Sequence, residues 1–390
     1  MSSQQIKTNR KSKLFSRFPM FSVAFLEAVI VCGCEKVPTF KEVIGQAPKA
    51  TETAAANQPD TKTAETPSLQ PAEVNPVRVV NPQEVITGFK AIRNFERTDS
   101  DLARLAELTS ELETITEMDL AAAKGVSDVG LKHVARIPNI ERLNLSGTSV
   151  TTAGFPVVSA LQKMKSLEFR SFAMDAEAIK TIVKVESLEQ LILSQTSGGE
   201  ADFALLCHLP ELRELDLSQR AISDQAIKSL ADCPKLEVLL LQRTPINGSG
   251  LLAFGAKKGP PLRVLNVNAT RFGEKGMPSL KGLETLEELH ASESGIVDQT
   301  LLQNLRGLGR LKKLELGLNA ITDVGAQAVS GLKSLEEVSF AGCGGVSDKT
   351  LGYLKSHKNL RRLDLKGCRI SPAAIQAFKK LQPNCELLTN

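Results

Sequence analysis

Aromatic residues are scarce in this 390-residue sequence, which contains no tryptophan and one tyrosine, Tyr353. Surfaces that stack nucleobases or sugar rings depend on such side chains. The formal net charge of +4 does not restore a nucleic-acid interpretation, because residues 1–33 hold five basic residues and one acidic residue. The rest of the chain carries 43 basic and 43 acidic residues. We therefore expect no nucleic-acid partner.

Motifs for catalysis and metal binding are also missing. The sequence has no HExxH, GxSxG, phosphate-loop or dinucleotide-binding pattern, and no Cys-x-x-Cys pair. Its four histidines, His133, His208, His290 and His357, are widely separated and lack metal-ligand spacing. We expect no enzyme activity, no metal and no cofactor.

A repeated unit dominates the remaining sequence. A Leu-x-x-Leu-x-Leu frame recurs every 24 to 26 residues, and its helical half recurs as GVSDVGL, AISDQAI, AITDVGA and GVSDKTL. The eleven complete frames begin at Ile115, Ile140, Met164, Leu188, Leu212, Leu236, Leu262, Leu286, Leu311, Leu335 and Leu360, and a truncated frame follows at Cys385. The spacing predicts a short strand, a turn and a helix in each unit. Such a unit buries its apolar edge only against copies of itself.

These frames resemble the leucine-rich repeat superfamily, in particular its ribonuclease-inhibitor-like and cysteine-containing branch. The resemblance covers residues 115–390 and implies an α/β solenoid: a leucine-rich repeat horseshoe with a concave parallel β-sheet and convex helices. About eleven repeats and a partial one are expected. Two amphipathic segments in residues 84–114 predict an N-terminal helical cap, which would cover the first strand.

The N-terminus resembles a bacterial lipoprotein signal. Basic residues up to Arg17 precede an apolar run, and Val31-Cys32-Gly33-Cys34 resembles the lipobox, in which the cysteine is lipidated. We interpret residues 1–34 as the signal peptide, with Cys34 as the lipidation site. An ordinary cleaved signal, an uncleaved anchor and the absence of export are the alternatives. Residues 35–83, rich in Thr, Ala, Pro and Glu, predict a disordered tether. The expected location is the cell envelope, as a membrane-anchored lipoprotein facing the periplasm or the exterior.

Alternation along each strand predicts which side chains face the concave side. That column turns apolar at Ile192 and Leu240, and the neighbouring column does so at Val238 and Val264. Grouped apolar residues on a polar surface commonly mark interaction sites, although scattered exposed apolar side chains are normal. The expected partner-binding residues are Ile192, Asp216, Arg220, Val238, Leu240, Arg243, Val264, Asn266 and His290. For His290, which has Glu288, Glu293 and Glu315 in nearby columns, an ordinary surface histidine is favoured over an acid–base centre.

Cys343 and Cys368 occupy equivalent positions after consecutive strands. At this position a small polar residue is expected to bond the backbone of the neighbouring turn. One strand spacing is within reach of a disulfide, but two stacked buried thiols are favoured over a Cys343–Cys368 bond. Cys207 and Cys233 fall at different frame positions and are expected to be core residues at helix ends.

The function expected from these features is non-catalytic: a protein–protein interaction scaffold at the bacterial cell envelope. It would bind a protein partner through the concave sheet and the membrane through its lipid anchor. Helix-bearing repeats of this type also resemble the substrate-binding part of F-box ubiquitin-ligase receptors, which is one alternative. A self-associating envelope protein, joined through its C-terminal end, is another.

Overall fold

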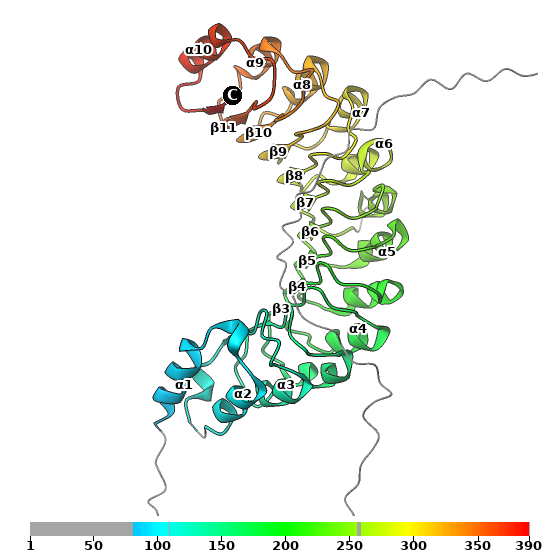
Figure 1. Ribbon diagram of the computed structural model, residues 1–390. Coiled ribbons are helices and arrows are strands. Elements are labelled where there is room, and N and C mark those ends of the chain that lie inside the picture. The colour runs from blue at the N-terminus through cyan, green and yellow to red at the C-terminus, as the bar shows by residue number, and fades with distance from the viewer. Residues whose placement is uncertain (1–80, 109, 256–258, 390) are drawn as a thin grey trace, which may run out of the picture. The chain divides into compact units, whose positions relative to one another are not determined.

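The computed structural model describes residues 81–108, 110–255 and 259–389 of a compact unit that spans Val74–Asn390. The expected signal peptide, Cys34 and nearly all of the expected tether lie outside the described residues. Within them, twelve strands form one parallel sheet in which spatial order follows sequence order. The strands line the inner side of the arc in Figure 1, and the helices line the outer side. The expected α/β solenoid of leucine-rich repeats is confirmed.

Each strand is three residues long and has its middle residue buried, except at the C-terminal edge. The strands are β1 Glu117–Asp119, β2 Arg142–Asn144, β3 Ser166–Glu168, β4 Gln190–Ile192, β5 Glu214–Asp216, β6 Val238–Leu240, β7 Val264–Asn266, β8 Glu288–His290, β9 Lys313–Glu315, β10 Glu337–Ser339, β11 Arg362–Asp364 and β12 Glu386–Leu388. Neighbouring strands pair without any shift in register, so the first and third residues form two continuous rows on the concave face.

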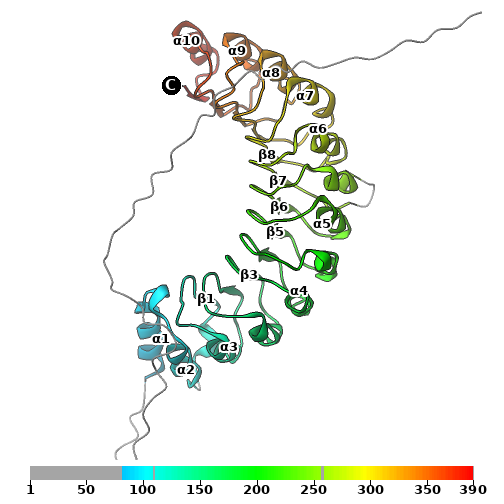
Figure 2. The same ribbon diagram turned by 45° about the vertical axis from the view of Figure 1, so that its right-hand side comes forward.

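Helices follow the strands on the convex side, as Figure 2 shows. The α-helices are α1 Pro82–Ala91, α2 Asp99–Ala106, α3 Asp128–Val134, α4 Ala176–Ile182, α5 Asp224–Ser229, α6 Gly273–Gly276, α7 Asp298–Asn304, α8 Asp323–Val329, α9 Asp348–Leu354 and α10 Pro372–Leu381. The longer 3₁₀ segments are η3 Thr152–Ala160, η4 Glu200–His208, η6 Ser249–Gly255 and η7 Met277–Gly282.

The recurring Ser/Thr-Asp pair begins helices and also joins them. Ser127 caps α3 by accepting a hydrogen bond from the Val129 N–H. Its own N–H and hydroxyl donate to the Asp99 carboxylate of the preceding helix at 2.8 and 2.6 Å. The same two contacts join Thr322 to Asp298. One dipeptide thus satisfies a helix terminus and fixes its position relative to the neighbouring helix.

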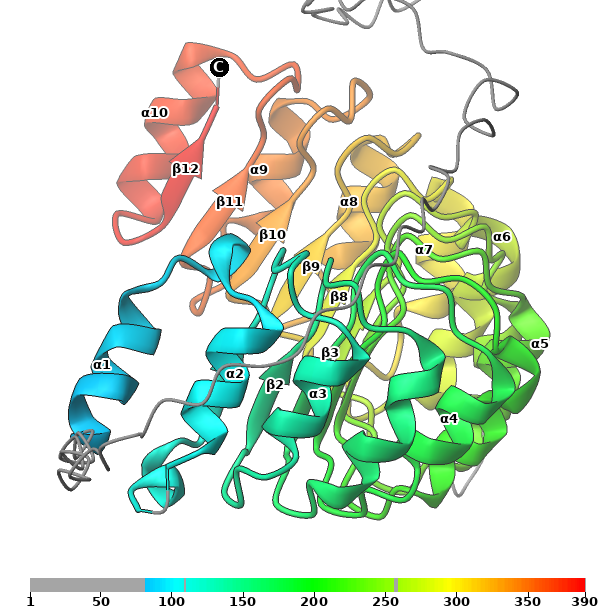
Figure 3. The same ribbon diagram turned by 60° about the horizontal axis from the view of Figure 1, so that its bottom comes forward.

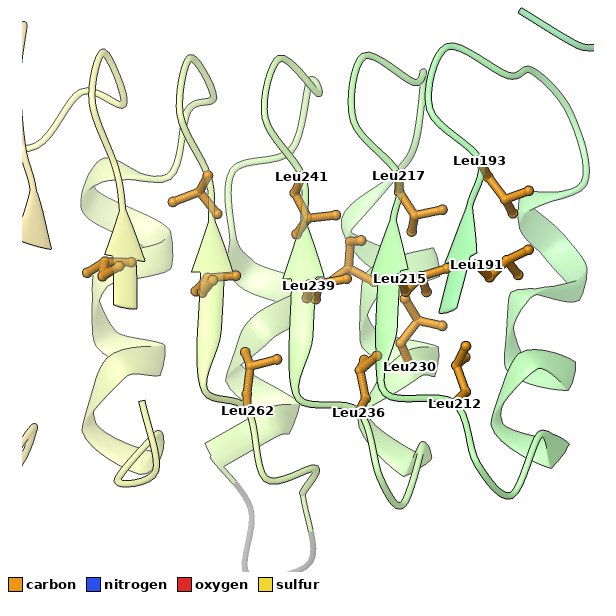
Figure 4. Packing of buried hydrophobic residues seen from close by; sticks show 14 of the residues in the cluster. Leu191, Leu193, Leu212, Leu215, Leu217, Leu230, Leu236, Leu239, Leu241 and Leu262 are labelled. Carbon is orange, nitrogen blue, oxygen red and sulfur yellow. The ribbon is translucent and has the colours of Figure 1, made fainter. Parts of the chain in front are cut away.

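The core is a continuous column of leucine side chains between strands and helices. Leu191, Leu215 and Leu239, the middle residues of three consecutive strands, are fully buried and point to the same side of the sheet (Figure 4). Burial of one such side chain stabilises the fold by about 1.5–3 kcal/mol. Because the period of side-chain direction in a strand is two, this burial also determines which residues face the concave side.

The first strand is covered by helical segments that precede it. Figure 3 shows α1 and α2 beside the first repeats. The guanidinium of Arg97 lies 4.5 Å from the Phe89 ring centroid and donates to the main-chain oxygen of Asp119 at the edge of β1. Asn94 donates to the Asp119 carboxylate at 2.6 Å. These contacts occupy an edge that would otherwise be open to pairing with another strand.

Candidate functional site

Four apolar side chains meet on the concave face of β4, β6 and β7: Ile192, Val238, Leu240 and Val264. We call these four residues the central patch. Val238 and Val264 are directly paired, and Leu240 is paired with Asn266 on one side and with Asp216 on the other. All four are half-buried, as are most strand residues that face the concave side. The predicted cluster is therefore assembled, with Ile192 separated from Leu240 by Asp216.

Arg220 does not lie at the rim of the central patch, so that prediction is wrong. Its side chain is 1% exposed and reaches into the preceding repeat. There it donates to the Thr196 hydroxyl and the Gly198 carbonyl, and its guanidinium lies 4.8 Å from the Phe203 ring centroid. Burial lowers the pKa of Arg220 to about 10. The long side chain of Arg220, with its three nitrogens, fills the space beside the irregular Gly198-Gly199 turn of the preceding repeat.

Asp216 is also less available to a partner than its place in the row suggested. It is 6% exposed, and its carboxylate accepts hydrogen bonds from the Ser218 N–H, at 2.8 Å, and the Ser218 hydroxyl. Arg243 is exposed on the turn after β6, where its φ of 57° is left-handed. The Asn266 amide oxygen accepts from the Asn268 N–H at 3.0 Å. The polar border of the patch thus consists of partly satisfied groups.

His290 belongs to the same row as Leu240, and its ring lies between the carboxylates of Glu288 and Glu315. Its Nδ1 is 2.7 Å from Glu315 and its Nε2 is 3.2 Å from Glu288. Burial lowers the pKa of His290, but the hydrogen bond and charge of Glu315 outweigh this effect, so the pKa lies above its ordinary value. The same contact holds the pKa of Glu315 at about 2. The cluster is a charge-assisted hydrogen-bond network.

A ladder of alternating charges runs along the residues that immediately precede the strands. Its members are Glu141, Lys165, Glu189, Arg213, Glu237, Arg263, Glu287, Lys312, Glu336 and Arg361. Arg263, for example, contacts Glu237 at 3.3 Å and Glu287 at 3.0 Å. Sequence reasoning missed this ladder, although the alternation is legible once the frames are aligned. The two ladder cations next to the central patch, Arg213 and Arg263, are therefore already paired.

The position after each strand has two different bonding patterns. The threonines Thr148, Thr196, Thr244 and Thr270 donate to a carbonyl of their own turn. The expected bond to a neighbouring turn is made in the later repeats, where Asn319 donates to the Ala291 carbonyl at 2.7 Å. The amide of asparagine is long enough to cross between turns, whereas the threonine hydroxyl bonds three residues back.

Cys343 and Cys368, which occupy the same position after consecutive strands, are unbridged thiols, so the disulfide between them is not formed. Cys343 donates to the Leu316 carbonyl at 3.3 Å and Cys368 to the Phe340 carbonyl at 3.2 Å. Both sulfurs therefore point toward the preceding repeat and not toward each other. Burial raises the pKa of both thiols, that of Cys368 to about 11, which keeps the donating proton in place.

A disulfide joins Cys207 and Cys233, which the sequence had placed in the core as separate residues. Their Cα atoms lie 4.1 Å apart although 26 residues separate them along the chain. This separation is close to one repeat, so stacking brings the two positions side by side. The irregular η4 segment shifts Cys207 by two residues relative to the regular frame, which concealed the pairing.

Two hollows lie in later repeats than the central patch, on different faces of the solenoid. One, of about 400 Å³, lies on the concave side of β9 to β11 and is lined by charged side chains that include Lys313, Glu315 and Arg362. The other, of about 670 Å³, lies between α7 and α8 on the helix side and is lined by Leu302 and Leu332 among others. The central patch itself lies on a strand face, which suits a macromolecular surface better than a small ligand.

Within the part of the chain that the structure describes, no group of three or more His, Cys, Asp and Glu side chains is placed to hold a metal ion. In the same residues, no helix is both long enough and apolar enough to span a bilayer.

Comparison with known proteins gives matches at the level of the repeat. Residues 154–255 match the family described as "FBD-associated F-box protein At5g56370, LRR repeats". Residues 311–330 and 356–379 match the family described as "Leucine Rich repeat". No curated protein matches the sequence significantly.

Solved structures resemble the chain across most of its length. An internalin from Listeria monocytogenes is 19% identical, with a TM-score of 0.51, and the match covers 79% of this chain and 87% of that one. A Leptospira interrogans LRR protein is 17% identical, with a TM-score of 0.47 and coverage of 74% of both chains. A structure of the yeast Rad7 and Elc1 complex gives 16% identity, a TM-score of 0.49, and coverage of 75% and 74%. The two family matches, the internalin fold and the observed stack of repeats together show that the chain is a leucine-rich repeat protein.

Proposed function

We propose that the protein is a non-catalytic scaffold that binds a partner protein through the central patch of its concave sheet. One observation carries this proposal: Ile192, Val238, Leu240 and Val264 are grouped on rows that are polar or charged at all other positions from β1 to β11. Leucine-rich repeats form a scaffold suited to protein–protein interaction. The sheet is preformed, so little ordering entropy opposes association.

The size of the expected effect follows from how much of each side chain remains to be buried. The four residues are half-buried in the free chain. Completing their burial would contribute about 0.8–1.5 kcal/mol each, half the value for a fully exposed side chain. Together they would act as the apolar centre of an interface, with the surrounding polar residues forming its rim.

We further propose that the scaffold is exported and held at the bacterial envelope by a lipid on Cys34. The basic and apolar stretches that precede this cysteine support the proposal. The Cys207–Cys233 disulfide supports it independently, because such bonds persist in oxidising compartments and are rare in the cytosol. Metabolic labelling with a fatty-acid analogue should mark the chain and fail to mark a Cys34→Ala variant.

Affinity capture from native cells tests the binding proposal. The bait is compared with a Leu240→Glu, Val264→Glu double variant and with a matched control, Val129→Glu, Val324→Glu, which adds the same charges at exposed helix positions. Circular dichroism first establishes that all three fold. A partner retained by the control and lost by the patch variant supports the proposal. A partner retained by both variants places the interface elsewhere.

A second candidate is the substrate-recognition subunit of an F-box-type ubiquitin ligase. The match of residues 154–255 to F-box-associated repeats favours it. This function requires a cytoplasmic eukaryotic protein, so fatty-acid labelling at Cys34 would exclude it. Self-association through the C-terminal end is a further candidate, because β12 pairs on one side with β11 and forms an edge of the described sheet. A mass that rises with concentration, and stops rising when residues 382–390 are removed, would support it.

A further inference from the structure

Two glutamates bracket the apolar centre of the concave face. Along the row of first strand residues, Glu214 pairs with Val238, Val238 with Val264, and Val264 with Glu288. Across β5, β6, β7 and β8, which follow one another along the sheet in Figure 1, the order is therefore acid, apolar, apolar, acid. Three strand spacings of about 4.8 Å place the two glutamate positions about 14 Å apart.

The protein's own cations leave these carboxylates largely unneutralised. Among the described residues, Glu214 has no ion pair, and its side chain makes no hydrogen bond. Arg213, its neighbour in sequence, contacts Glu237, and Arg263 contacts Glu237 and Glu287. Glu288 contacts His290 through one oxygen at 3.2 Å. On the next strand, Lys313 is paired directly with Glu288, but its amine contacts Glu315, at 3.1 Å.

Because Arg220 is buried, its positive charge does not offset the negative charge at the rim of the central patch. At the rim, its guanidinium would lie close to Asp216 and offset the negative charge of β5. Instead it is buried against Phe203, on the far side of the turn that follows the strand. Arg243 lies beyond the end of β6, on the exposed turn, and among the described residues it forms no ion pair or hydrogen bond with either glutamate. The patch is thus apolar at its centre and negative on both flanks.

We propose that the partner is a protein segment that presents apolar side chains between two cationic side chains about 14 Å apart. This inference rests on the proposed function and adds the partner's chemistry to it. The apolar residues would cover Val238, Val264 and Leu240, and a lysine or arginine at each end would reach Glu214 and Glu288. A segment with acidic flanks would meet repulsion at both ends, so the two glutamates select among apolar segments as well as attract.

A selection from a random peptide display library tests the inference with the full chain as bait. Three further baits are used: Glu214→Lys, Glu288→Lys; Leu240→Glu, Val264→Glu; and a control reversal, Glu117→Lys, Glu386→Lys, at the same row position on β1 and β12. Enriched peptides are synthesised, and their dissociation constants are measured by fluorescence anisotropy at low and high salt. Light scattering of the unmodified chain monitors whether a second copy occupies the patch.

The expected result is enrichment of Lys or Arg on both sides of an apolar pair. The Glu214→Lys, Glu288→Lys variant should bind these peptides at least about tenfold more weakly, since two rim charge pairs of about 0.7 kcal/mol each are lost and repulsion adds to this loss. Peptides with glutamate in place of their basic residues should regain binding to that variant. The control reversal should bind as the unmodified chain does.

Two other outcomes separate the two proposals. Peptides that need Leu240 and Val264 but bind the charge-reversed variant within about twofold would overturn the inference and leave the proposed function standing. Peptides that bind the Leu240→Glu, Val264→Glu variant unchanged, or the absence of any enrichment, would overturn both. A dimer of the unmodified chain that the Leu240→Glu, Val264→Glu variant fails to form would overturn the inference as well, because a second copy would then be the occupant.

Discussion

Replacing Arg220 tests how the irregular fourth repeat, whose frame begins at Leu188, is held in place. The buried Arg220 guanidinium donates to Thr196 and to the Gly198 carbonyl, and it stacks on Phe203. Replacement by Met keeps the volume of the stem and removes the charge. Replacement by Ala also removes the volume and leaves a cavity between two repeats. Comparing the two variants therefore separates the contribution of packing from that of the cation.

The opposing contributions can be sized from the structure. The fall of the Arg220 pKa from the ordinary arginine value to about 10 corresponds to a burial cost of about 3.5 kcal/mol, at about 1.4 kcal/mol per pH unit. Two hydrogen bonds from a charged donor contribute about 1.5–3 kcal/mol each, and the aromatic contact about 0.5–2 kcal/mol. The charge is therefore slightly favourable on balance. We expect Arg220→Met to lower the free energy of unfolding by about 1 kcal/mol and Arg220→Ala by about 3–5 kcal/mol.

Urea unfolding followed by far-ultraviolet circular dichroism measures both changes. The m-value must be compared as well, because a repeat protein with a weakened repeat can lose cooperativity. Arg243→Met is the control: this arginine is exposed, and its replacement should change stability by less than about 0.5 kcal/mol. An Arg220→Met variant as unstable as Arg220→Ala would refute the conclusion that packing dominates. An Arg220→Ala variant as stable as the parent would refute the burial of this side chain.

Three further predictions concern stability. Replacing Cys207 and Cys233 by serine should cost about 3.5 kcal/mol, the loop-closure value for a 26-residue separation, as measured by urea unfolding with and without reductant. His357→Leu should raise the melting temperature, because both ring nitrogens are buried without a partner; burial lowers the pKa of this histidine, so the gain should grow as pH falls below 6.5. His290→Gln should do the opposite. The pKa of His290 is raised beside Glu315, so its contribution of about 0.5–1 kcal/mol should be present near pH 5.5 and lost as pH rises through the folded-state pKa.

The repeat frame made most of the fold predictable from the sequence. Alternation within Leu-x-x-Leu-x-Leu placed Ile192 and Leu240 in one concave row, and the structure has that row in register. This inference works because leucine burial leaves a strand one orientation. The frame positions alone also predicted that Val238 lies next to Val264, as it does in the sheet. The spacing of apolar residues within a repeat can be read directly from the sequence, without knowledge of the contacts between repeats.

Side-chain direction at the turns was not predictable in the same way. Arg220 occupies a position where four other repeats have threonine, and its frame position alone suggested an exposed rim cation. It is buried because the Gly198-Gly199 turn of the preceding repeat leaves room for a long side chain, which depends on the geometry of two repeats together. The disulfide between Cys207 and Cys233 was concealed for a related reason. The η4 segment offsets one cysteine from the regular frame.

The charge ladder explains how a concave surface can be acidic beside its apolar centre without weakening the stack. Neighbouring ladder residues of opposite sign are one strand spacing apart, about 4.8 Å, while residues of like sign are about 9.6 Å apart, close to the Debye length of about 8–10 Å in physiological salt. Attraction between neighbours therefore exceeds the screened repulsion along the ladder. Because Arg213 and Arg263 are engaged by Glu237, they hold adjacent repeats together and leave Glu214 to face outward. Stability and recognition are thus assigned to adjacent columns of the same sheet, and a partner can be selected by changing one column while the other is preserved.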